Sequence, residues 1–337
     1  MSKIHSITAR LRQGVRHILK GAAVAGLASL AAGIVATPAL AQKAPSEAPQ
    51  ALRIGYQKYG TLVILKARGT LDKRLAEKGV NVKWTEFPFG PPLLEAINVG
   101  SLDVGTVGEA PPIFAQAAGA DLVYVGNEPP APTAEALVVP KDSQIKSVAD
   151  LKGRKIAVAK GSNANYLLIK LIEKAGLKFS DVSVVYLAPA DARAAFESGR
   201  VDAWSIWDPF LAAAEKQLGA RVLADGRGAV ANHQFYLAAR SFAEKHPEII
   251  HILLDEIAKV DQWGKQNPKE VAKFIAPLIG IELPIAELAA QRLTYGVKPV
   301  TDEVLAQQQK VADAFAELKL VPKPVRVADA AWKNSRK

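Results

Sequence analysis

A regular alternation of short β-branched runs with longer helical patterns constrains the fold of this chain of 337 residues more than any other feature. Such alternation is typical of βαβ units around a mostly parallel sheet. Close to half of the residues are hydrophobic, so the chain can also bury a sizeable core. We predict an α/β protein in which Thr61–Lys78 forms one continuous helix. Strands are predicted at residues 52–56, 80–87, 102–108, 122–128, 134–140, 155–160, 182–188, 201–207, 221–226 and 234–240.

The pattern changes after the last of these strands. From Phe242 to about Phe315 it is almost wholly helical, and prolines mark the breaks between helices and their first turns. A closing helical segment after two α/β halves fits a two-lobed protein. We expect the chain to cross between the lobes near Ala134–Pro140 and again near Asn232–Arg240.

The first 41 residues differ in character from the rest. A long basic region precedes the apolar run Gly21–Ala36, and Ala39-Leu40-Ala41 follows. These are the three parts of a secretory signal peptide, and the run is shorter than the roughly 20 residues that a membrane-spanning helix needs. We predict cleavage after Ala41, a mobile leader over residues 42–50 and a free protein in a bacterial periplasm. An uncleaved anchor is the alternative.

Composition excludes several classes of function. Cysteine is absent, which excludes disulfides, a thiol nucleophile and a lipid-anchored cysteine. Five of the 43 Lys and Arg residues, and none of the 33 Asp and Glu residues, lie in residues 1–41, so the remaining chain has 38 basic against 33 acidic residues, or +5. No basic run is interleaved with aromatic residues, so nucleic-acid binding is not expected. The mild excess weakly suits an acidic small ligand.

Four times along the chain a strand ends, a glycine or small polar residue follows, and a helix begins. In open α/β sheets the carboxyl ends of strands face a crevice, and each helix N-terminus there presents unpaired N–H groups with a partial positive charge. Several such ends in one cleft would hold an anion without a dedicated arginine. The four junctions are Gly55–Leu65, Val107–Gln116, Ala159–Leu168 and Trp204–Ala213.

The third junction contains Gly161-Ser162-Asn163. Ser162 is suited to cap the helix that follows, and Gly161 permits a close approach of the backbone. In a second interpretation, the Ser162 hydroxyl, the Asn163 amide and the first N–H groups hold the tetrahedral oxygens of a ligand. Neither a P-loop nor a Gly-x-Ser-x-Gly pattern is present, so nucleotide hydrolysis and α/β-hydrolase chemistry lose their local support.

The first two junctions bring a lysine and an acid toward the predicted cleft. Gln57, Lys58 and Tyr59 are expected in a loop that faces it, where Lys58 is either a counter-charge or a solvated lysine. Glu109 precedes tandem prolines, in a first helical turn where the helix dipole favours an acid. If Glu109 faces the cleft, it should pair with Lys58 or receive the amino or hydroxyl end of a ligand.

The fourth junction contains two tryptophans and an acid. Asp208 before Pro209 is typical of an N-cap followed by the first helical residue. Trp204 and Trp207 lie three apart, on opposite faces of a strand, so at most one should face the cleft. That tryptophan could cover an alkyl or ring group of the ligand.

The histidines lack the spacing of metal ligands, and neither a metal nor a cofactor is expected. His233 lies at the return crossing with Gln234 beside it, so both are expected near the cleft. A triad of Ser162, His233 and Asp208 can be drawn. It is the only candidate catalytic group for the alternative of a secreted enzyme.

With these junctions in order, the chain from about Leu52 to Trp332 resembles the periplasmic aliphatic sulfonate-binding proteins of ABC importers. This group is part of a wider one that includes nitrate- and taurine-binding proteins. The resembling stretches are RIGYQKYGTLVILKARG, VKWTEFPFGPPLLEAINVGSLDVGTVGEAPPIFAQAAGADLVYVGNEPP, SVADLKGRKIAVAKGSN, YLAPADARAAFESGRVDAWSIWDPFLAAAEKQLGARVL and NHQFYLAAR.

The resemblance implies a type II periplasmic binding protein, with two α/β lobes joined by two crossover strands that let the lobes close on a ligand. We expect residues 51–136 and 236–337 to form lobe I and residues 137–235 to form lobe II. The resemblance also implies a small anionic sulfonate as ligand, a membrane ABC permease as partner, a monomer and no catalysis. The implied ligand contacts are Gln57, Lys58, Gly108, Glu109, Ser162, Asn163, Trp204, Asp208 and Gln234, with Glu128 a weaker candidate.

A sulfonate carries three acceptor oxygens and a permanent charge, so its site needs several fixed donors. We expect N–H groups at Ser162 and Asn163, the Ser162 hydroxyl and Gln57 or Gln234 to bind the oxygens, while Trp204 covers the carbon chain. The alternatives keep the fold with taurine, nitrate, a sulfate ester or a pyrimidine precursor as ligand. A secreted hydrolase and a soluble sensor domain that docks on a membrane receptor are further alternatives.

Overall fold

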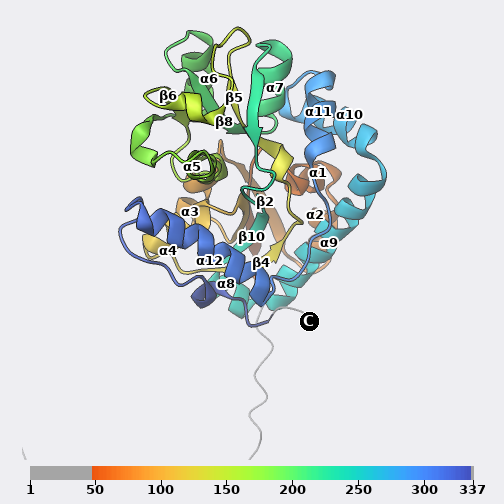
Figure 1. Cartoon of the computed structure of the whole chain (residues 1–337). Helices are drawn as coiled ribbons and strands as arrows, with labels where there is room; N and C mark the ends of the chain where they lie inside the picture. The colour runs from red at the N-terminus through yellow and green to blue at the C-terminus, as the bar shows by residue number, and fades with distance from the viewer. Residues whose placement is uncertain (1–47, 335–337) are drawn as a thin grey trace, which may run out of the picture. The chain divides into compact units, whose positions relative to one another are not determined.

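The computed structural model describes residues 48–334, so the predicted signal peptide and most of the leader lie outside the described residues. Each of the ten predicted strand regions contains one strand, which confirms the interpretation of the β-branched runs (Figure 1). The strands are β1 (Ala51–Tyr56), β2 (Asn81–Glu86), β3 (Val104–Gly108), β4 (Leu122–Asn127), β5 (Glu135–Val139), β6 (Lys155–Val158), β7 (Ser183–Tyr186), β8 (Ala203–Trp207), β9 (Arg221–Asp225) and β10 (Gln234–Ala239).

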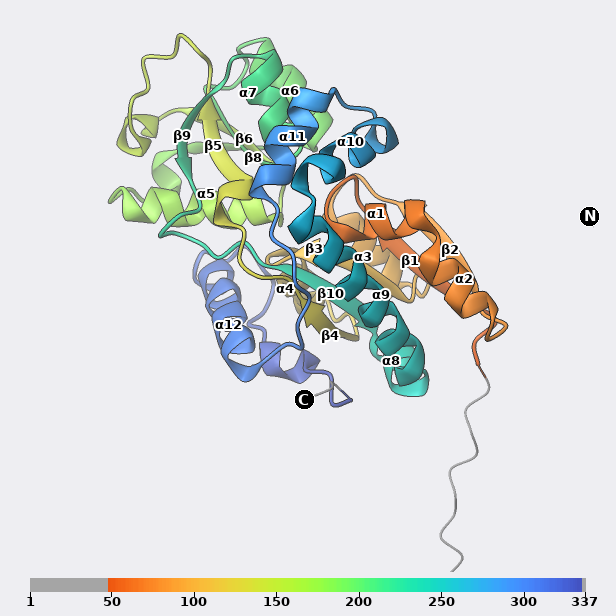
Figure 2. The same ribbon diagram turned by 90° about the vertical axis from the view of Figure 1, so that its right-hand side faces the viewer.

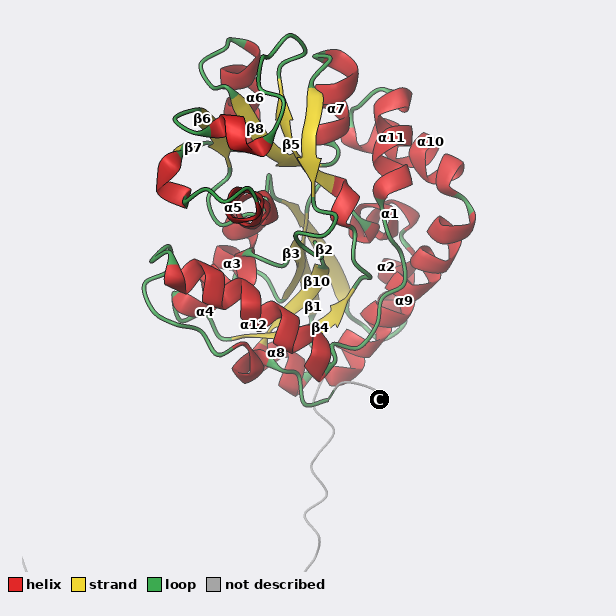
Figure 3. Ribbon diagram, in the orientation of Figure 1, coloured by secondary structure: helices red, strands yellow, loops and turns green. Residues whose placement is uncertain are grey.

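Helices flank both faces of the strands (Figure 3). They are α1 (Thr61–Arg68), α2 (Thr70–Ala76), α3 (Gly90–Asn98), α4 (Pro111–Ala117), α5 (Asn163–Lys174), α6 (Pro189–Glu197), α7 (Phe210–Gln217), α8 (Arg240–Lys245), α9 (Pro247–Gln266), α10 (Pro268–Ile279), α11 (Leu283–Arg292) and α12 (Asp302–Glu317). Short 3-10 turns are η1 (Pro132–Ala134), η2 (Val148–Leu151), η3 (Phe179–Asp181) and η4 (Val327–Ala330).

The single helix expected over Thr61–Lys78 is wrong. Gly69 ends α1 with a φ of 64°, a left-handed conformation that glycine adopts without strain, and its N–H donates to the carbonyls of Leu65 and Lys66. A new helix, α2, starts at the next residue.

The strands form two five-stranded sheets, and each sheet with its helices is one lobe. The first sheet has the order β2-β1-β3-β10-β4, and the second has the order β7-β6-β8-β5-β9. In each sheet a single strand runs against the others: β10 is antiparallel to β3 and β4, and β5 is antiparallel to β8 and β9. These are the two strands at which the chain changes sheet, so both sheets are mixed.

This direction of β5 and β10 decides which residues meet between the lobes. Because each is antiparallel to its neighbours, its first residue lies at the end of the sheet where the neighbouring strands finish. Gln234, at the start of β10, is paired with Gly108 at the end of β3, and Glu135, at the start of β5, is paired with Trp207 at the end of β8. In each sheet, the end that faces the other lobe therefore carries the last residues of the parallel strands and the first residues of one antiparallel strand.

Apolar clusters on both faces of each sheet hold the lobes together. In the first lobe, α1, α2 and α9 pack over Leu52, Ile54 and Val104, and α3, α4 and α12 cover the other face around Phe235 and Leu237. In the second lobe, α5 covers the face of Leu137 and Val139, while α6 and α7 cover the opposite face. No helix among residues 48–334 combines the length and apolar character needed to span a membrane.

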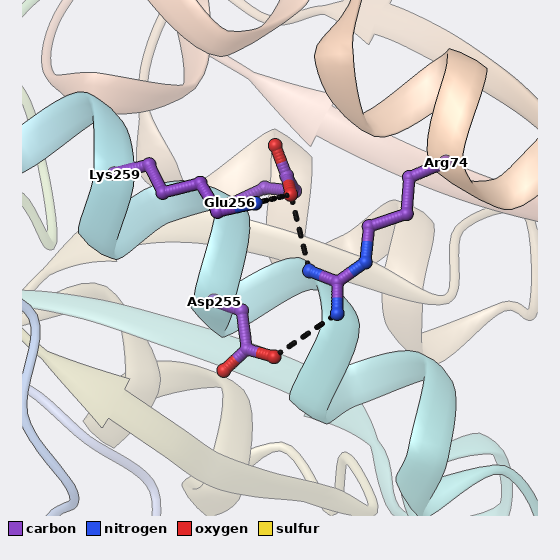
Figure 4. A network of polar contacts seen from close by, with 4 residues as sticks. All are labelled: Arg74, Asp255, Glu256 and Lys259. Carbon is purple, nitrogen blue, oxygen red and sulfur yellow. Dashed lines mark hydrogen bonds and ion pairs between the residues drawn. The ribbon is translucent and has the colours of Figure 1, made fainter.

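A polar network joins α2 to α9 at the rim of the first lobe. The Arg74 guanidinium lies 3.3 Å from Asp255 Oδ2 and 3.1 Å from Glu256 Oε1, and Lys259 Nζ lies 2.6 Å from the same oxygen of Glu256 (Figure 4). Burial opposes ionisation of Glu256, but hydrogen bonds from Lys259, Thr70 and Arg74 hold its pKa below the ordinary value. The network stabilises the first lobe and lies away from the strand ends that face the other lobe.

The helical segment predicted after Phe242 is present, and part of it reaches the second lobe. Figure 2 shows α10 and α11 beside the junction of the lobes, with α11 next to α7. Ile285 and Ala289 of α11 pack on Ala212 and Ala213 of α7. Arg292, at the end of α11, donates to Glu215 Oε2 at 2.6 Å and to Asp208 Oδ1 at 3.4 Å. The chain then returns to the first lobe, where α12 packs.

Candidate functional site

A pocket lies between the two lobes. Its lining comes from strand ends, from the start of β10 and from the helix N-termini that follow the strands, as the edge geometry requires. Five predicted contact residues line it, namely Gln57, Gly108, Ser162, Asn163 and Gln234. Five further residues complete the lining: Tyr59, Gly90, Pro111, Trp207 and Asn232.

The N-terminus of α5 forms one wall of the pocket. Ser162 is its N-cap: Oγ accepts from the N–H of Asn165 at 3.2 Å and donates to the carbonyl of Ala159 at 2.7 Å. Among the described residues, the N–H groups of Asn163 and Ala164 have no hydrogen-bond partner. The capping interpretation of Ser162 is thus confirmed, and the two donors left for a ligand are backbone amides.

Asn163 reaches from α5 across to the first lobe. Its Oδ1 accepts from the N–H of Ala110 at 3.0 Å, and its Nδ2 donates to Asn232 Oδ1 at 2.6 Å. The side chain lies directly against Gly108, where a Cβ atom would come within 2.1 Å of Asn163 Nδ2. Gly108 is therefore needed for the lobes to meet at this distance, and Asn163 joins them.

Two glutamines supply side-chain donors on the first lobe. Gln57 is buried, and its Nε2 donates to the carbonyl of Thr106 at 3.0 Å, which leaves its second N–H for another acceptor. Gln234 is partly exposed at the start of β10 and lines the same pocket. Both lie on the opposite side of the pocket from α5, so a ligand between them can receive hydrogen bonds from two lobes.

Lys58 does not line this pocket. Its side chain is about half exposed, and its Nζ lies 3.7 Å from Glu86 Oε1. Of the two alternatives expected for Glu109, pairing with Lys58 is not observed, because Glu109 is buried and its Oε2 accepts instead from the backbone N–H of His233 at 3.1 Å. The other oxygen, Oε1, is buried without a partner. Burial raises the pKa of Glu109, and the contacts with His233 oppose that rise.

The two tryptophans of β8 face opposite ways, as predicted, and Trp207 is the one that lines the pocket. Trp204 is 1% exposed and packs on Phe196 in the cluster under α6 and α7. Trp204 therefore does not contact the pocket, and its predicted role of covering the ligand has no support in this structure. The period of the strand separates the two side chains, but it does not decide which face is turned to the other lobe.

Asp208 is fully buried at the start of α7 and does not line the pocket. Its Oδ1 accepts from the N–H of Ala212 at 3.0 Å, and Arg292 lies beside it. The helix begins at Phe210, one residue later than the sequence pattern predicted. Burial raises the pKa of Asp208 to about 7, against the lowering effect of Arg292.

Two more buried acids lie at the sheet edges. Glu128 accepts from the hydroxyl of Tyr236 at 2.7 Å and from the N–H of Gly296 at 2.9 Å, and burial with the nearby charge of Asp261 raises its pKa well above the ordinary value. Glu135 has no exposed surface, and neither of its carboxyl oxygens has a hydrogen-bond partner. Glu135 was not predicted, because its position depends on the direction of β5 in the sheet.

The residues of the drawn triad do not contact one another. Ser162 Oγ bonds to the backbone of its own helix turn, and Asp208 bonds to Ala212 and Arg292. His233 Nδ1 lies 2.9 Å from the carbonyl of Glu128, and its Nε2 lies 3.3 Å from Gln307 Oε1. A nucleophile, base and orienting acid in hydrogen-bond contact are thus not assembled here. Residues 48–334 also contain no group of three or more His, Asp or Glu side chains placed to hold a metal ion.

The missed lining residues carry weak local signals. Gly90 and Pro111 belong to strand-to-helix junctions, and Asn232 precedes the return strand, so each could have been found by extending the junction argument. Pro111 packs where a Cβ on Gly90 would come within 2.6 Å of it, which explains the glycine. Trp207 needed only the choice of the other strand face.

Comparisons with known proteins agree with this architecture. Residues 75–271 match the family described as NMT1/THI5 like. A putative aliphatic sulfonates-binding protein of Escherichia coli (strain K12) is 47% identical over 324 residues, which cover 96% of this chain and 98% of that protein.

Solved structures match over nearly the whole described region. The alkanesulfonate-binding protein SsuA of Xanthomonas axonopodis pv. citri, bound to MOPS, superimposes with a TM-score of 0.80 at 41% identity, covering 84% of this chain and 98% of that one. The periplasmic aliphatic sulphonate binding protein SsuA of Escherichia coli does so with a TM-score of 0.78 at 46% identity, covering 86% and 94%. The fold is therefore that of a two-lobed periplasmic binding protein, and the chain belongs to the NMT1/THI5-like family, among its aliphatic sulfonate-binding proteins.

Proposed function

We propose that this protein captures an alkanesulfonate between its two lobes and delivers it to an ABC permease in the membrane. The observation that carries the proposal is the N-terminus of α5: Ser162 and Asn163 line a pocket that the opposite lobe closes, and the amides of Asn163 and Ala164 in this helix turn are unpaired. Helix N-termini bind anions through such donors and through the helix dipole. The relatives named above are binding proteins for the same class of ligand.

The lining suits the two ends of an alkanesulfonate. The sulfonate oxygens would accept from the amides of Asn163 and Ala164 and from the side chains of Gln57 and Gln234. Trp207 would cover the carbon chain. Ser162 would act by capping the helix and fixing the two amides in place, because its hydroxyl already donates to Ala159. Four donors from two lobes match three delocalised oxygens better than one strong cation does.

Delivery requires the lobes to separate and close. Asn163 and Gly108 form the contact that closure makes, and the segments before β5 and β10 are the crossings about which the lobes would move. We propose the predicted division into 51–136 with 236–337 for lobe I and 137–235 for lobe II, with each boundary moved by two residues so that all of β5 lies in lobe II and all of β10 in lobe I. The helix α11 belongs with lobe II, because it packs on α7. The closed form would be the one that a permease recognises.

Location and chemistry follow from the same proposal. The similar SsuA structure from Escherichia coli is that of a periplasmic protein, and the basic-apolar start of this chain with Ala39-Leu40-Ala41 supports export and cleavage after Ala41. We propose that the exported protein binds its ligand without chemical change, because Ser162, His233 and Asp208 do not assemble into a catalytic group. A monomer is the oligomeric state that we propose with it.

The test is native mass spectrometry of the protein as purified, followed by calorimetric titration with a series of linear alkanesulfonates, sulfate and nitrate. We expect a retained mass that matches a sulfonate and dissociation constants in the micromolar range or below for the sulfonates only. Tight binding of nitrate or sulfate with no binding of sulfonates would contradict the proposal. Hydrolysis of a generic ester that Ser162→Ala abolishes would instead revive the enzyme alternative.

A further inference from the structure

Asn232, in the crossing before β10, has an unusual backbone conformation for a residue with a side chain. Its φ is 54°, in the left-handed region, and among residues 48–334 only Lys319 shares this property outside glycine. Asparagine tolerates this region better than most residues do, but glycine tolerates it best. Asn232 is also buried and lines the pocket. An asparagine at such a position indicates that its side chain has a role.

The side chain of Asn232 joins the two crossings to the second lobe. Its Nδ2 donates to the carbonyl of Ala131, in the crossing before β5, at 2.8 Å. Its Oδ1 accepts from Asn163 Nδ2, at the N-terminus of α5, at 2.6 Å. The N–H of Ala131 in turn donates to the carbonyl of Ala231 at 3.1 Å. The two crossings are thus bonded to each other, and α5 is bonded to both through one side chain.

The first lobe fixes the turn that contains Asn232. The N–H of His233 donates to Glu109 Oε2 at 3.1 Å, and His233 Nδ1 lies 2.9 Å from the carbonyl of Glu128. Both acids follow strands of the first sheet, after β3 and β4. The bond between Asn163 and Asn232 is therefore a buried contact between the lobes, beside the one from the N–H of Ala110 to Asn163 Oδ1.

The chemistry of position 232 requires the asparagine side chain. Its amide has both a donor, for the carbonyl of Ala131, and an acceptor, for Asn163 Nδ2. Aspartate would offer acceptors only, and would place a carboxylate against that carbonyl. Glycine would adopt the same φ with neither bond, and alanine would lose both bonds and be strained as well.

We propose that Asn232 is a positioning residue for ligand capture, which holds Asn163 against the first lobe and so prolongs the closed, ligand-bound state. The inference rests on the proposed function, in which the backbone N–H of Asn163 binds the sulfonate. Asn163 would then bind the ligand with its main chain and the first lobe with its side chain. Because opening has to break the contacts of that side chain, their loss should speed release more than it slows capture.

The experiment measures the two rates by stopped-flow mixing with ethanesulfonate, followed by the intrinsic fluorescence to which Trp207 in the pocket contributes. Asn232→Gly keeps the backbone conformation and removes both side-chain bonds. We expect its dissociation rate to rise about tenfold, because Asn163 Nδ2 is left without a partner in the closed form, while the association rate stays within about threefold of the wild type.

A double variant tests whether the two asparagines act through the same bond. Asn163→Ala keeps the backbone N–H that binds the sulfonate and removes the side-chain contacts between the lobes. If Asn232 acts by holding Asn163, the double variant Asn163→Ala, Asn232→Gly should release ethanesulfonate about as fast as Asn163→Ala alone, within about twofold. Effects of the two substitutions that multiply would contradict the proposal.

Two further variants separate the side-chain bonds from the backbone conformation. Asn232→Ala should release ethanesulfonate as fast as Asn232→Gly but unfold at a lower temperature, because alanine is strained at a positive φ. Lys319→Gly is the matched control, since Lys319 has a φ of 55°, is exposed and lies outside the pocket. Its rates of binding and release should equal those of the wild type.

The outcomes distinguish this inference from the proposed function. If ethanesulfonate does not bind the wild-type protein, the proposed function fails and the inference fails with it. If it binds and Asn232→Gly releases it at the wild-type rate, the proposed function stands and the role of Asn232 is wrong. A fall in the association rate with an unchanged dissociation rate would also overturn the inference, because Asn232 would then act on capture rather than on the closed state.

Discussion

Two groups of polar residues between the lobes differ in whether they line the pocket. The donor side, formed by Gln57, Gln234 and the N-terminus of α5, lines it and keeps free donors, namely the amides of Asn163 and Ala164 and the second N–H of Gln57. Glu109 and Glu135 are buried outside the lining, and three of their four carboxyl oxygens have no hydrogen-bond partner. Burial raises the pKa of both acids and so opposes their charged form. The donor side is thus placed to bind an anion, whereas the two acids are buried groups beside the site.

The largest expected effect concerns Asp208, a buried acid outside the pocket that tests how burial acts on carboxyl groups in this fold. In the folded protein its pKa is raised to about 7, whereas an unfolded chain ionises Asp near 3.9. The folded state therefore binds more protons between these values, and the free energy of unfolding should fall as the pH rises from 4 to 7. For Asp208→Asn, the fall should be smaller by about 3 kcal/mol.

Urea unfolding at pH 4, 5, 6 and 7 measures this difference. Asp142→Asn, at an exposed position, is the matched control and should follow the wild-type curve. An unfolding free energy that rises over this pH range in the wild type, or an Asp208→Asn curve parallel to it, would contradict the expected direction.

The next effect separates closure of the lobes from contact with the ligand. Gly108→Ala places a Cβ atom 2.1 Å from Asn163 Nδ2, so the lobes cannot close to their present distance. We expect sulfonate affinity to fall by about 2 kcal/mol, with little change in melting temperature because each lobe keeps its own core. Calorimetry and thermal unfolding measure the two quantities. The double variant Gly108→Ala, Asn163→Ala removes the clash and should regain part of the affinity. A further loss of affinity would mean that the clash is not the cause of the weaker binding.

On the donor side, Ser162→Ala removes the N-cap that fixes the two free amides. Sulfonate affinity should fall by roughly 1 to 3 kcal/mol, together with about 1 kcal/mol of stability. Thr301→Ala is the matched control, because Thr301 caps α12 in the same way, accepting from Val304 at 3.3 Å, and lies outside the pocket. It should lower stability without changing affinity. Unchanged affinity for Ser162→Ala by calorimetry would remove α5 from the anion site.

The smallest effect is expected at Lys58, the one predicted contact that carries a positive charge. Its pair with Glu86 is exposed and 3.7 Å long, so Lys58→Ala should change stability and affinity by no more than about 0.5 kcal/mol. A loss of affinity of tenfold or more would mean that Lys58 turns into the pocket when a ligand binds. The anion would then depend on a cation as well as on the amides.

Much of the donor side could be predicted from sequence because its signals are local. Gly161-Ser162 before an amphipathic run indicates a capped helix whatever surrounds it, and the ten β-branched runs indicate their strands in the same way. Gln57 and Gly108 follow, because each stands at the end of a predicted strand. The break at Gly69 was missed, since an isolated glycine in a helical pattern is tolerated more often than it ends the helix.

The position of Glu135 could not be predicted, because it depends on how strands are ordered. Glu135 lies at the beginning of a strand, and strand beginnings in a parallel sheet point away from the ligand crevice. Only the antiparallel direction of β5 brings it to the edge where β8 ends. The choice between Trp204 and Trp207 is of the same kind, since the period of two fixes opposite faces but not which face meets the other lobe.

The insertion of β10 between β3 and β4 also determines the order in which the protein can fold. Thr106 and Phe235, which meet through a hydrogen bond between β3 and β10, are 129 positions apart in the chain. The first sheet therefore lacks its fourth strand, and the cores on both of its faces stay incomplete, until the second lobe has been synthesised. Contacts so distant in sequence form slowly, because the loop between them must close first. The first half of the chain thus reaches its final packing only after the second lobe has been made, which would suit the export proposed above.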